Sequence, residues 1–116
     1  MNIASIGGVY GCAGASYSAA KNGVIALTKN LAIQYHGTGI RANSVSPGST
    51  LTPLFGPETF AGADVEMIEL TKRVHVREFE EMIPAEKQAS VVLFLACDDS
   101  AAVSGQDIVV DRGGRL

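Results

Sequence analysis

The sequence predicts an α/β fold, in which short parallel strands alternate with longer helices. Three short apolar segments are bounded by Gly, Pro or Ser, and segments of helical periodicity separate them in the order strand, helix, strand, two helices, strand. Strands that alternate with helices pair in parallel through right-handed crossovers. A chain of 116 residues, 47% hydrophobic and 18% charged, can form one domain with a buried core. We therefore expect one sheet of about three strands with three to four helices.

The amino-terminal third is expected to form a strand, a loop and a long helix. Residues 1–4 are an apolar run that leads through Ser5 into the glycines at 7–8, which is typical of a buried strand that leaves into a loop. Ser5 would then lie at the carboxyl end of this strand. The helix is expected from about Ser16 until Gly37. Its buried stripe would consist of Ala20, Val24, Leu27 and Leu31.

The middle of the chain is expected to form a second strand, a loop and an exposed helix. Residues 40–46 predict a strand that Pro47 and Gly48 stop, and residues 49–63 are rich in Pro, Gly and Thr without periodicity, as in a loop. Apolar residues spaced among many charges predict an amphipathic helix over residues 64–81, broken near His75.

The carboxyl-terminal part is expected to form a buried helix and a third strand. Pro84 precedes a helix over residues 85–97, and residues 108–110 after Gly105 predict the strand. The buried stripe of this helix would consist of Ala89, Val92, Leu93 and Ala96.

A parallel sheet of three strands is thin, and a strand that begins at the first residue would have an unpaired edge. Two explanations stay open. The chain is the carboxyl-terminal part of a longer doubly wound domain, or a second copy supplies the missing surface by dimerisation. In both cases we expect the 116-residue chain to self-associate.

Composition and charge exclude several classes of partner. A net charge of −3, a pI near 5.2 and the lack of a basic cluster argue against a nucleic-acid partner. Cys12 and Cys97 are far apart, and neither they nor the two histidines have metal-ligand spacing, so we expect no metal site. No apolar run approaches the about 18 residues that span a bilayer. We expect a cytoplasmic protein with reduced cysteines and no membrane partner.

Ser5, Tyr17 and Lys21 are the candidate catalytic residues. Tyr17 and Lys21 are four residues apart in the predicted helix, so their side chains emerge on one face, one turn from each other. An ammonium beside a phenol favours the ionised phenol. Such a phenol can give a proton to a carbonyl oxygen as hydride arrives, or take one from an alcohol as hydride leaves. Ser5 would hold the same oxygen by a hydrogen bond.

Further motifs accompany these three residues. The chain reads N-I-A-S at residues 2–5, N-S-V-S-P-G-S-T-L-T at residues 43–52 and S-G-Q-D-I-V-V-D at residues 104–111. Together with the spacing of Ser5, Tyr17 and Lys21, these motifs resemble the short-chain dehydrogenase/reductase family. The resemblance extends from Asn2 to Gly114, with the motifs in the family's order and at about its spacings.

The resemblance implies a nicotinamide-dependent oxidoreductase that interconverts a ketone and a secondary alcohol, with NAD or NADP as cofactor. Tyr17 resembles the general acid/base, Ser5 the donor to the substrate oxygen, and Lys21 the residue that favours ionised Tyr17 and binds the nicotinamide ribose. The loop after Thr52 and the helix from Asp64 correspond to the family's substrate lid. A small carbonyl or alcohol substrate and a homo-oligomer are implied too. The residues that resemble cofactor contacts are Tyr17, Lys21, Pro47, Gly48, Thr50 and Thr52.

Some parts of the family's pattern have no counterpart in the 116 residues. These are the glycine-rich phosphate turn, the residue that selects NAD or NADP, and the Asn-Asn-Ala-Gly segment. Gly8, Gly11 and Gly14 are interpreted as loop glycines rather than a displaced phosphate turn. The family's usual Asp-Gly-Gly near the end is replaced by Asp-Arg-Gly-Gly at residues 111–114.

We therefore expect residues 1–116 to be a single partial domain, the catalytic and substrate half of a Rossmann-type domain without its amino-terminal nucleotide-binding half. The isolated chain would be inactive, because the hydride donor would lack its binding site. The alternative is a noncatalytic remnant or a dimerising interaction module that keeps the motif without binding cofactor.

Overall fold

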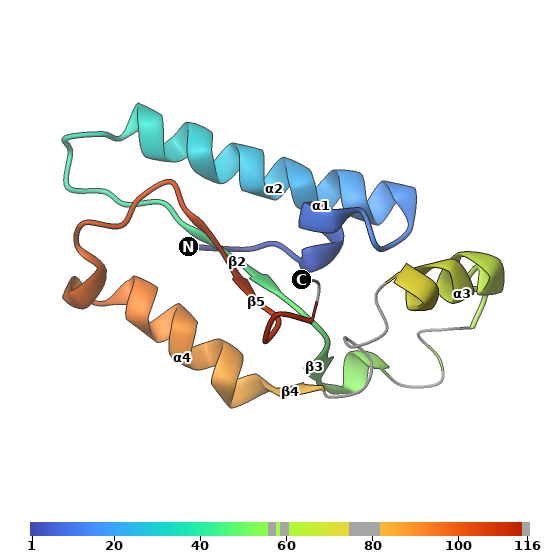
Figure 1. Ribbon diagram of the computed structural model, residues 1–116. Helices are drawn as coiled ribbons and strands as arrows, with labels where there is room; N and C mark the ends of the chain where they lie inside the picture. Colours follow the sequence, from blue (N-terminus) through green and yellow to red (C-terminus); the bar gives the residue numbers. More distant parts are fainter. Residues whose placement is uncertain (56–57, 59–60, 75–81, 115–116) are drawn as a thin grey trace.

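The computed structural model describes residues 1–55, 58, 61–74 and 82–114. They contain a parallel sheet of three strands, in the order β1 (Asn2–Ile3), β2 (Ser44–Pro47) and β5 (Asp107–Val110). The long helices α2 (Ala15–Gln34) and α4 (Ala85–Ala96) lie on opposite sides of this sheet (Figure 1). The predicted α/β fold, the carboxyl-terminal part of a doubly wound Rossmann-type sheet, is confirmed, with both long helices close to their expected positions.

The register of the strands places the motifs at residues 2–5 and 43–52 at the same edge of the sheet, where the carboxyl ends of the strands lie. Ile3 is paired with Val45 in the parallel ladder between β1 and β2. Ser5 and Pro47 each come two residues later, so both lie where their strands leave the sheet. We call this edge the carboxyl edge.

A short helix, α1 (Ile6–Tyr10), replaces the loop that was expected after β1. Ser5 is its N-cap, and the Ser5 hydroxyl oxygen accepts a hydrogen bond from the Gly7 backbone N–H at 3.0 Å. Gly11 ends the helix with a φ of 67°. The loop prediction was wrong for Gly8, which lies inside α1. Glycines are poor helix formers, so propensity could not reveal a helix that its cap and its contact with α2 stabilise.

A second difference lies in the region expected to be a loop. Residues Thr50–Leu51 form β3, which pairs in parallel with β4 (Ile83–Pro84), and Pro53–Phe55 form a short 3₁₀ helix. The bond from the Ile83 N–H to the Ser49 carbonyl oxygen, at 2.8 Å, extends this pairing. Sequence reasoning missed this pairing because β3 lies in a stretch rich in Pro, Gly and Thr, and because β4 has only two residues.

The charged helix predicted over residues 64–81 is observed as α3 (Val65–Val74). It lies away from the sheet, beyond the carboxyl edge (Figure 1). The break expected near His75 and the rest of that prediction lie outside the described residues.

The second strand begins later than predicted, at Ser44 instead of Ile40. Side chains hold the preceding segment. The Asn43 amide donates to the Val103 carbonyl oxygen at 2.8 Å, and the Arg41 guanidinium donates to the same oxygen at 3.1 Å. These side-chain bonds add to backbone bonds of the same segment, in which the Ala42 and Asn43 carbonyl oxygens accept from the N–H groups of Gly105 and Asn2.

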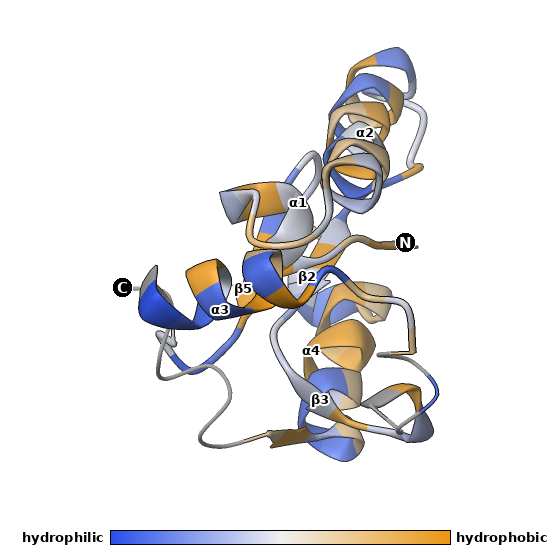
Figure 2. Cartoon of the chain, turned by 90° about the vertical axis from the view of Figure 1, so that its right-hand side faces the viewer, coloured by the Kyte–Doolittle hydropathy of each residue, from blue (hydrophilic) through white to orange (hydrophobic). Residues whose placement is uncertain are grey.

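The buried stripes predicted for the two long helices were wrong, because none of their eight residues is buried. Val24, Leu31 and Val92 are half-buried, and the exposed ones are Ala20, Leu27, Ala89, Leu93 and Ala96. In α2 the buried residues are Ile25 and Thr28, whereas Leu27 is 53% exposed. In α4 they are Gln88 and Leu95. Both helices carry hydrophobic residues on more than one side (Figure 2), so periodicity alone could not identify the inner face.

Polar side chains pack between α2 and the sheet. The Thr28 hydroxyl accepts from the Asn2 amide at 2.9 Å and donates to the Val24 carbonyl oxygen. The Asp107 carboxylate accepts from Ser44 Oγ at 2.6 Å and from Ser46 Oγ at 2.9 and 2.8 Å. These bonds join the first residue of β5 to the first and third residues of β2.

Candidate active site

The three candidate catalytic residues converge on the carboxyl end of β1. Ser5 comes two residues after the end of this strand, while Tyr17 and Lys21 lie on the first two turns of α2. The Lys21 ammonium donates to the Ile3 carbonyl oxygen at 3.1 Å and lies 5.8 Å from the centre of the Tyr17 ring. Lys21 therefore joins the phenol on α2 to the end of the strand that carries Ser5.

Gly7 connects Ser5 with Tyr17. Its backbone N–H binds the Ser5 hydroxyl oxygen, and a Cβ atom placed on Gly7 would lie 3.1 Å from Tyr17 Cε1. The Tyr17 ring therefore lies directly against the turn that Ser5 caps. The structure brings the serine, the tyrosine and the lysine together through this turn, as their sequence spacing predicted.

The polar groups of the site are free to act on a bound molecule. Within the described part of the chain, the Ser5 hydroxyl proton has no acceptor, and Lys21 makes no hydrogen bond other than that to Ile3. An ammonium has three donors. The Tyr17 side chain is 46% exposed, so a small molecule can reach it from solvent.

The segment from Pro47 to Thr52 leaves the same edge of the sheet. Gly48 donates its N–H to the Val110 carbonyl oxygen at 3.0 Å, and the Thr50 hydroxyl donates to the Gly48 carbonyl oxygen at 2.9 Å. Thr52 is half-buried directly after β3. The structure thus places Pro47, Gly48, Thr50 and Thr52 on a turn that hydrogen bonds hold against β5.

Gln88 supports this turn, although sequence reasoning did not single it out. Its side chain is 7% exposed, and its amide nitrogen donates to Thr50 Oγ1 at 3.3 Å and to the Val110 carbonyl oxygen at 2.9 Å. A signal was present in the sequence, because Gln88 is one and two helical turns from Val91 and Leu95 on the inner face of α4.

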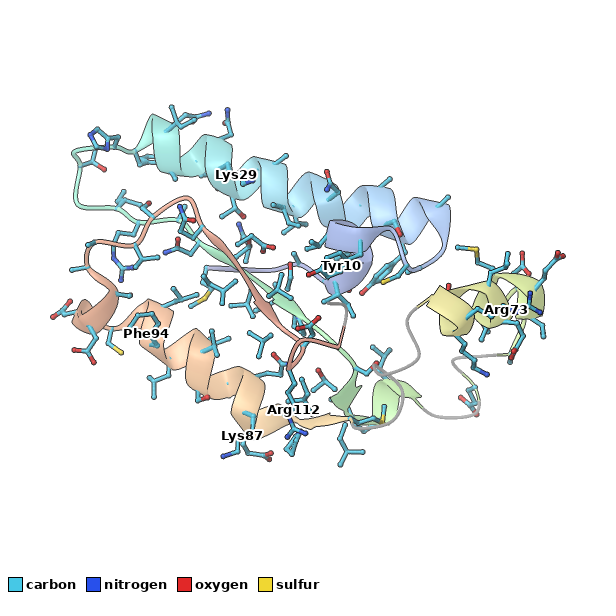
Figure 3. The ribbon with its side chains drawn as sticks, in the orientation of Figure 1. Tyr10, Lys29, Arg73, Lys87, Phe94 and Arg112 are labelled. Atoms are coloured by element: carbon cyan, nitrogen blue, oxygen red, sulfur yellow. The ribbon has the colours of Figure 1, made fainter. Side chains whose placement is uncertain are left out.

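The turn after β5 packs against the segment from Pro47 to Thr52. A Cβ atom placed on Gly48 would lie 2.8 Å from Asp111 Cβ, so the two backbones are in close contact. One oxygen of Asp111 accepts from the Gly113 N–H at 2.9 Å. Arg112 takes a φ of 56° at the position where the family's pattern has glycine, and Figure 3 shows its side chain near the start of α4.

Other features lie away from this cluster or beside it. A hollow of about 280 Å³ is at the opposite, amino-terminal edge of the sheet and contains none of the candidate catalytic residues; Met1, Gly39, Arg41, Asn43, Leu95 and Ala96 line it. Tyr10, the last residue of α1, is 40% exposed beside α2 (Figure 3).

Across the described ranges, no group of three or more His, Cys, Asp or Glu could hold a metal ion. No helix there is both long and apolar enough to cross a membrane.

Comparison with known proteins identifies similar sequences. A family model described as enoyl-(acyl carrier protein) reductase matches residues 1–114. Levodione reductase of Leifsonia aquatica is 36% identical over 121 residues, which cover 97% of this chain and 43% of that protein. Cyclohexanol dehydrogenase of Acinetobacter sp. (strain SE19) is 41% identical over 112 residues, covering 96% of this chain and 41% of that protein. The chain spans less than half the length of the curated relatives it matches.

Solved structures with the same fold include enzymes with bound cofactor. A short chain dehydrogenase from Mycobacterium paratuberculosis bound to NAD has a TM-score of 0.81 at 28% identity, and the match covers 97% of this chain and 43% of that one. A 4-hydroxyisoleucine dehydrogenase complexed with NADH has a TM-score of 0.73 at 29% identity, covering 97% and 44%.

Proposed function

The chain belongs to the short-chain dehydrogenase/reductase family, and from this premise we propose that it carries the proton-transfer site of a nicotinamide-dependent oxidoreductase. The proposed reaction interconverts a ketone and a secondary alcohol. The observation that carries the proposal is the cluster at the carboxyl end of β1, where Lys21 lies against the Tyr17 ring and Tyr17 lies against the turn capped by Ser5.

Each of the three residues has a role that its contacts permit. Tyr17 gives its phenol proton to the carbonyl oxygen as hydride adds to the carbonyl carbon, and takes a proton from the alcohol in the reverse direction. Ser5 donates a hydrogen bond from its hydroxyl to the same oxygen and keeps its proton, while its own oxygen accepts from the Gly7 N–H. Lys21 stabilises the negative charge that Tyr17 carries after it gives up its proton.

The residues at the carboxyl edge fit a nicotinamide cofactor, which supplies or accepts the hydride when bound. Lys21 keeps donors for ribose hydroxyls, because among the described residues it binds Ile3 alone. Tyr17 lies beside it. The turn formed by Pro47, Gly48, Thr50 and Thr52 would contact the nicotinamide end. The NAD and NADH in the similar solved structures support this class of cofactor, and either NAD or NADP is compatible with these residues.

We further propose that residues 1–116 form the catalytic and substrate half of a Rossmann-type domain, in a cytoplasmic homo-oligomer that acts on a small carbonyl or alcohol. Exposed apolar side chains on both long helices support association, since Leu27 is 53% and Leu93 is 67% exposed. The same exposure favours a second candidate function, in which the 116-residue chain is a noncatalytic dimerising module.

Titration of the 116-residue chain and of the full-length protein with NADH and NADPH separates these functions. Nicotinamide fluorescence reports binding, and Lys21→Ala is the control variant. Saturable binding that the variant loses supports the oxidoreductase, and ketone reduction by the full-length protein completes the test. If the full-length protein binds neither cofactor while the chain dimerises, the interaction module is the better explanation.

A further inference from the structure

We infer that Gly7 is a positioning residue of this site, because its missing side chain sets where the Tyr17 ring lies relative to Ser5. The inference rests on the proposed function and adds to it a residue that touches neither substrate nor cofactor. It starts from α1, which has five residues and is too short to be stable alone. The position of α1, and with it the capping Ser5, therefore depends on its contact with α2.

Gly8 fixes that contact between two backbones. A Cβ atom on Gly8 would lie 2.7 Å from both the Asn22 nitrogen and the Lys21 carbonyl carbon. Backbone atoms of a long helix cannot move aside, so this crossing admits only glycine. The Asn22 amide closes the contact by donating to the Gly8 carbonyl oxygen at 3.0 Å. α1 is thus held against α2 at Lys21, one turn beyond Tyr17.

A side chain added at residue 7 would contact other side chains, whereas one added at residue 8 would contact backbone. Its added Cβ would lie 3.1 Å from Tyr17 Cε1, 3.3 Å from Tyr17 Cδ1 and 3.1 Å from the Ala13 methyl group. Distances of this size require the neighbour to move by a few tenths of an ångström. With α1 fixed through Gly8, the Tyr17 ring is the group that can rotate away. A methyl group at residue 7 therefore displaces the proposed acid/base from the serine hydroxyl without separating the helices.

The test compares Gly7→Ala with Gly14→Ala, whose added methyl group meets no atom within 4 Å at a φ of −52°. The full-length protein is labelled with ¹³C in its tyrosine rings, and the chain's three tyrosines include Tyr17, whose signal is assigned by its loss in Tyr17→Phe. We expect Gly7→Ala to shift the Tyr17 signal and to lower kcat by about 10- to 100-fold, with the KM for cofactor unchanged. Gly14→Ala should change neither quantity.

The outcomes separate the inference from the function on which it rests. An unshifted Tyr17 signal, or a wild-type kcat, in Gly7→Ala overturns the role of Gly7. If the wild-type protein reduces no ketone, the proposed function fails and the ring signal alone decides the role of Gly7. Should Gly7→Ala fold poorly, Gly7→Ala combined with Ala13→Gly removes the second contact and leaves the Tyr17 ring as the group that the new methyl meets. The Tyr17 ring signal and the kcat of this double variant then decide whether Gly7 positions the ring.

Discussion

Replacement of Asp107 by alanine should destabilise the protein through two buried serines. Ser44 and Ser46 are both 0% exposed, and both hydroxyls donate to the Asp107 carboxylate. Without this acceptor, each hydroxyl is left unpaired in the interior, which costs about 1–3 kcal/mol. Asp107→Ala should therefore lower the free energy of unfolding by about 2–6 kcal/mol. Urea unfolding of the protein, followed by circular dichroism, measures this loss.

A combined variant tests whether unpaired hydroxyls cause the loss. Removing both hydroxyls together with their acceptor leaves no buried polar group unsatisfied, and such changes can be nearly neutral. Asp107→Ala with Ser44→Ala and Ser46→Ala should therefore be more stable than Asp107→Ala alone by about 1 kcal/mol or more. The reasoning is refuted if Asp107→Ala costs less than about 1 kcal/mol, or if the combined variant is the less stable of the two.

Four further substitutions test other parts of the structure. Tyr17→Phe should lower kcat for ketone reduction by about 10²- to 10⁴-fold while NADH or NADPH binding is kept; wild-type turnover would contradict its role as acid/base. Gln88→Leu should lower the free energy of unfolding by about 0.5–1.5 kcal/mol, because the Val110 carbonyl oxygen keeps its bond from the Gly48 N–H but loses the Gln88 donor, and an unchanged urea midpoint would show that the amide is dispensable. Gly8→Ala should lower thermal stability because of its 2.7 Å approach to backbone, whereas Gly23→Ala, in open space within α2, should raise stability by about 0.5–1 kcal/mol; equal melting temperatures would contradict both expectations.

The sequence could predict the elements that have a strong local pattern. The long helices stand in long stretches of helical periodicity, the three strands of the sheet lie in short apolar segments bounded by Gly, Pro or Ser, and parallel pairing followed from their alternation. The sequence also indicated that Ser5, Tyr17 and Lys21 lie close together. Helical spacing places Tyr17 and Lys21 on one face of α2, and Ser5 comes at the carboxyl end of β1.

Contacts between distant segments could not be predicted in the same way. The bonds from Ser44 to Asp107 depend on a register between β2 and β5 that no local pattern determines. The inner faces of the long helices were assigned wrongly in part because apolar residues such as Leu27 and Leu93 also occur on their outer faces. Helix α1 was missed because tertiary contact, rather than propensity, stabilises it.

The glycine pair of α1 has a consequence for enzyme engineering. Gly8 admits no side chain, so a mutant library that includes this position would consist mostly of unfolded proteins. A side chain added at residue 7 would meet the Ala13 methyl group and the Tyr17 ring, so the volumes at residues 7 and 13 can be exchanged. A library of paired substitutions at residues 7 and 13 would therefore sample small changes in the direction of proton transfer. Selection from such a library on bulkier ketones could widen the substrate range without altering any group that reacts.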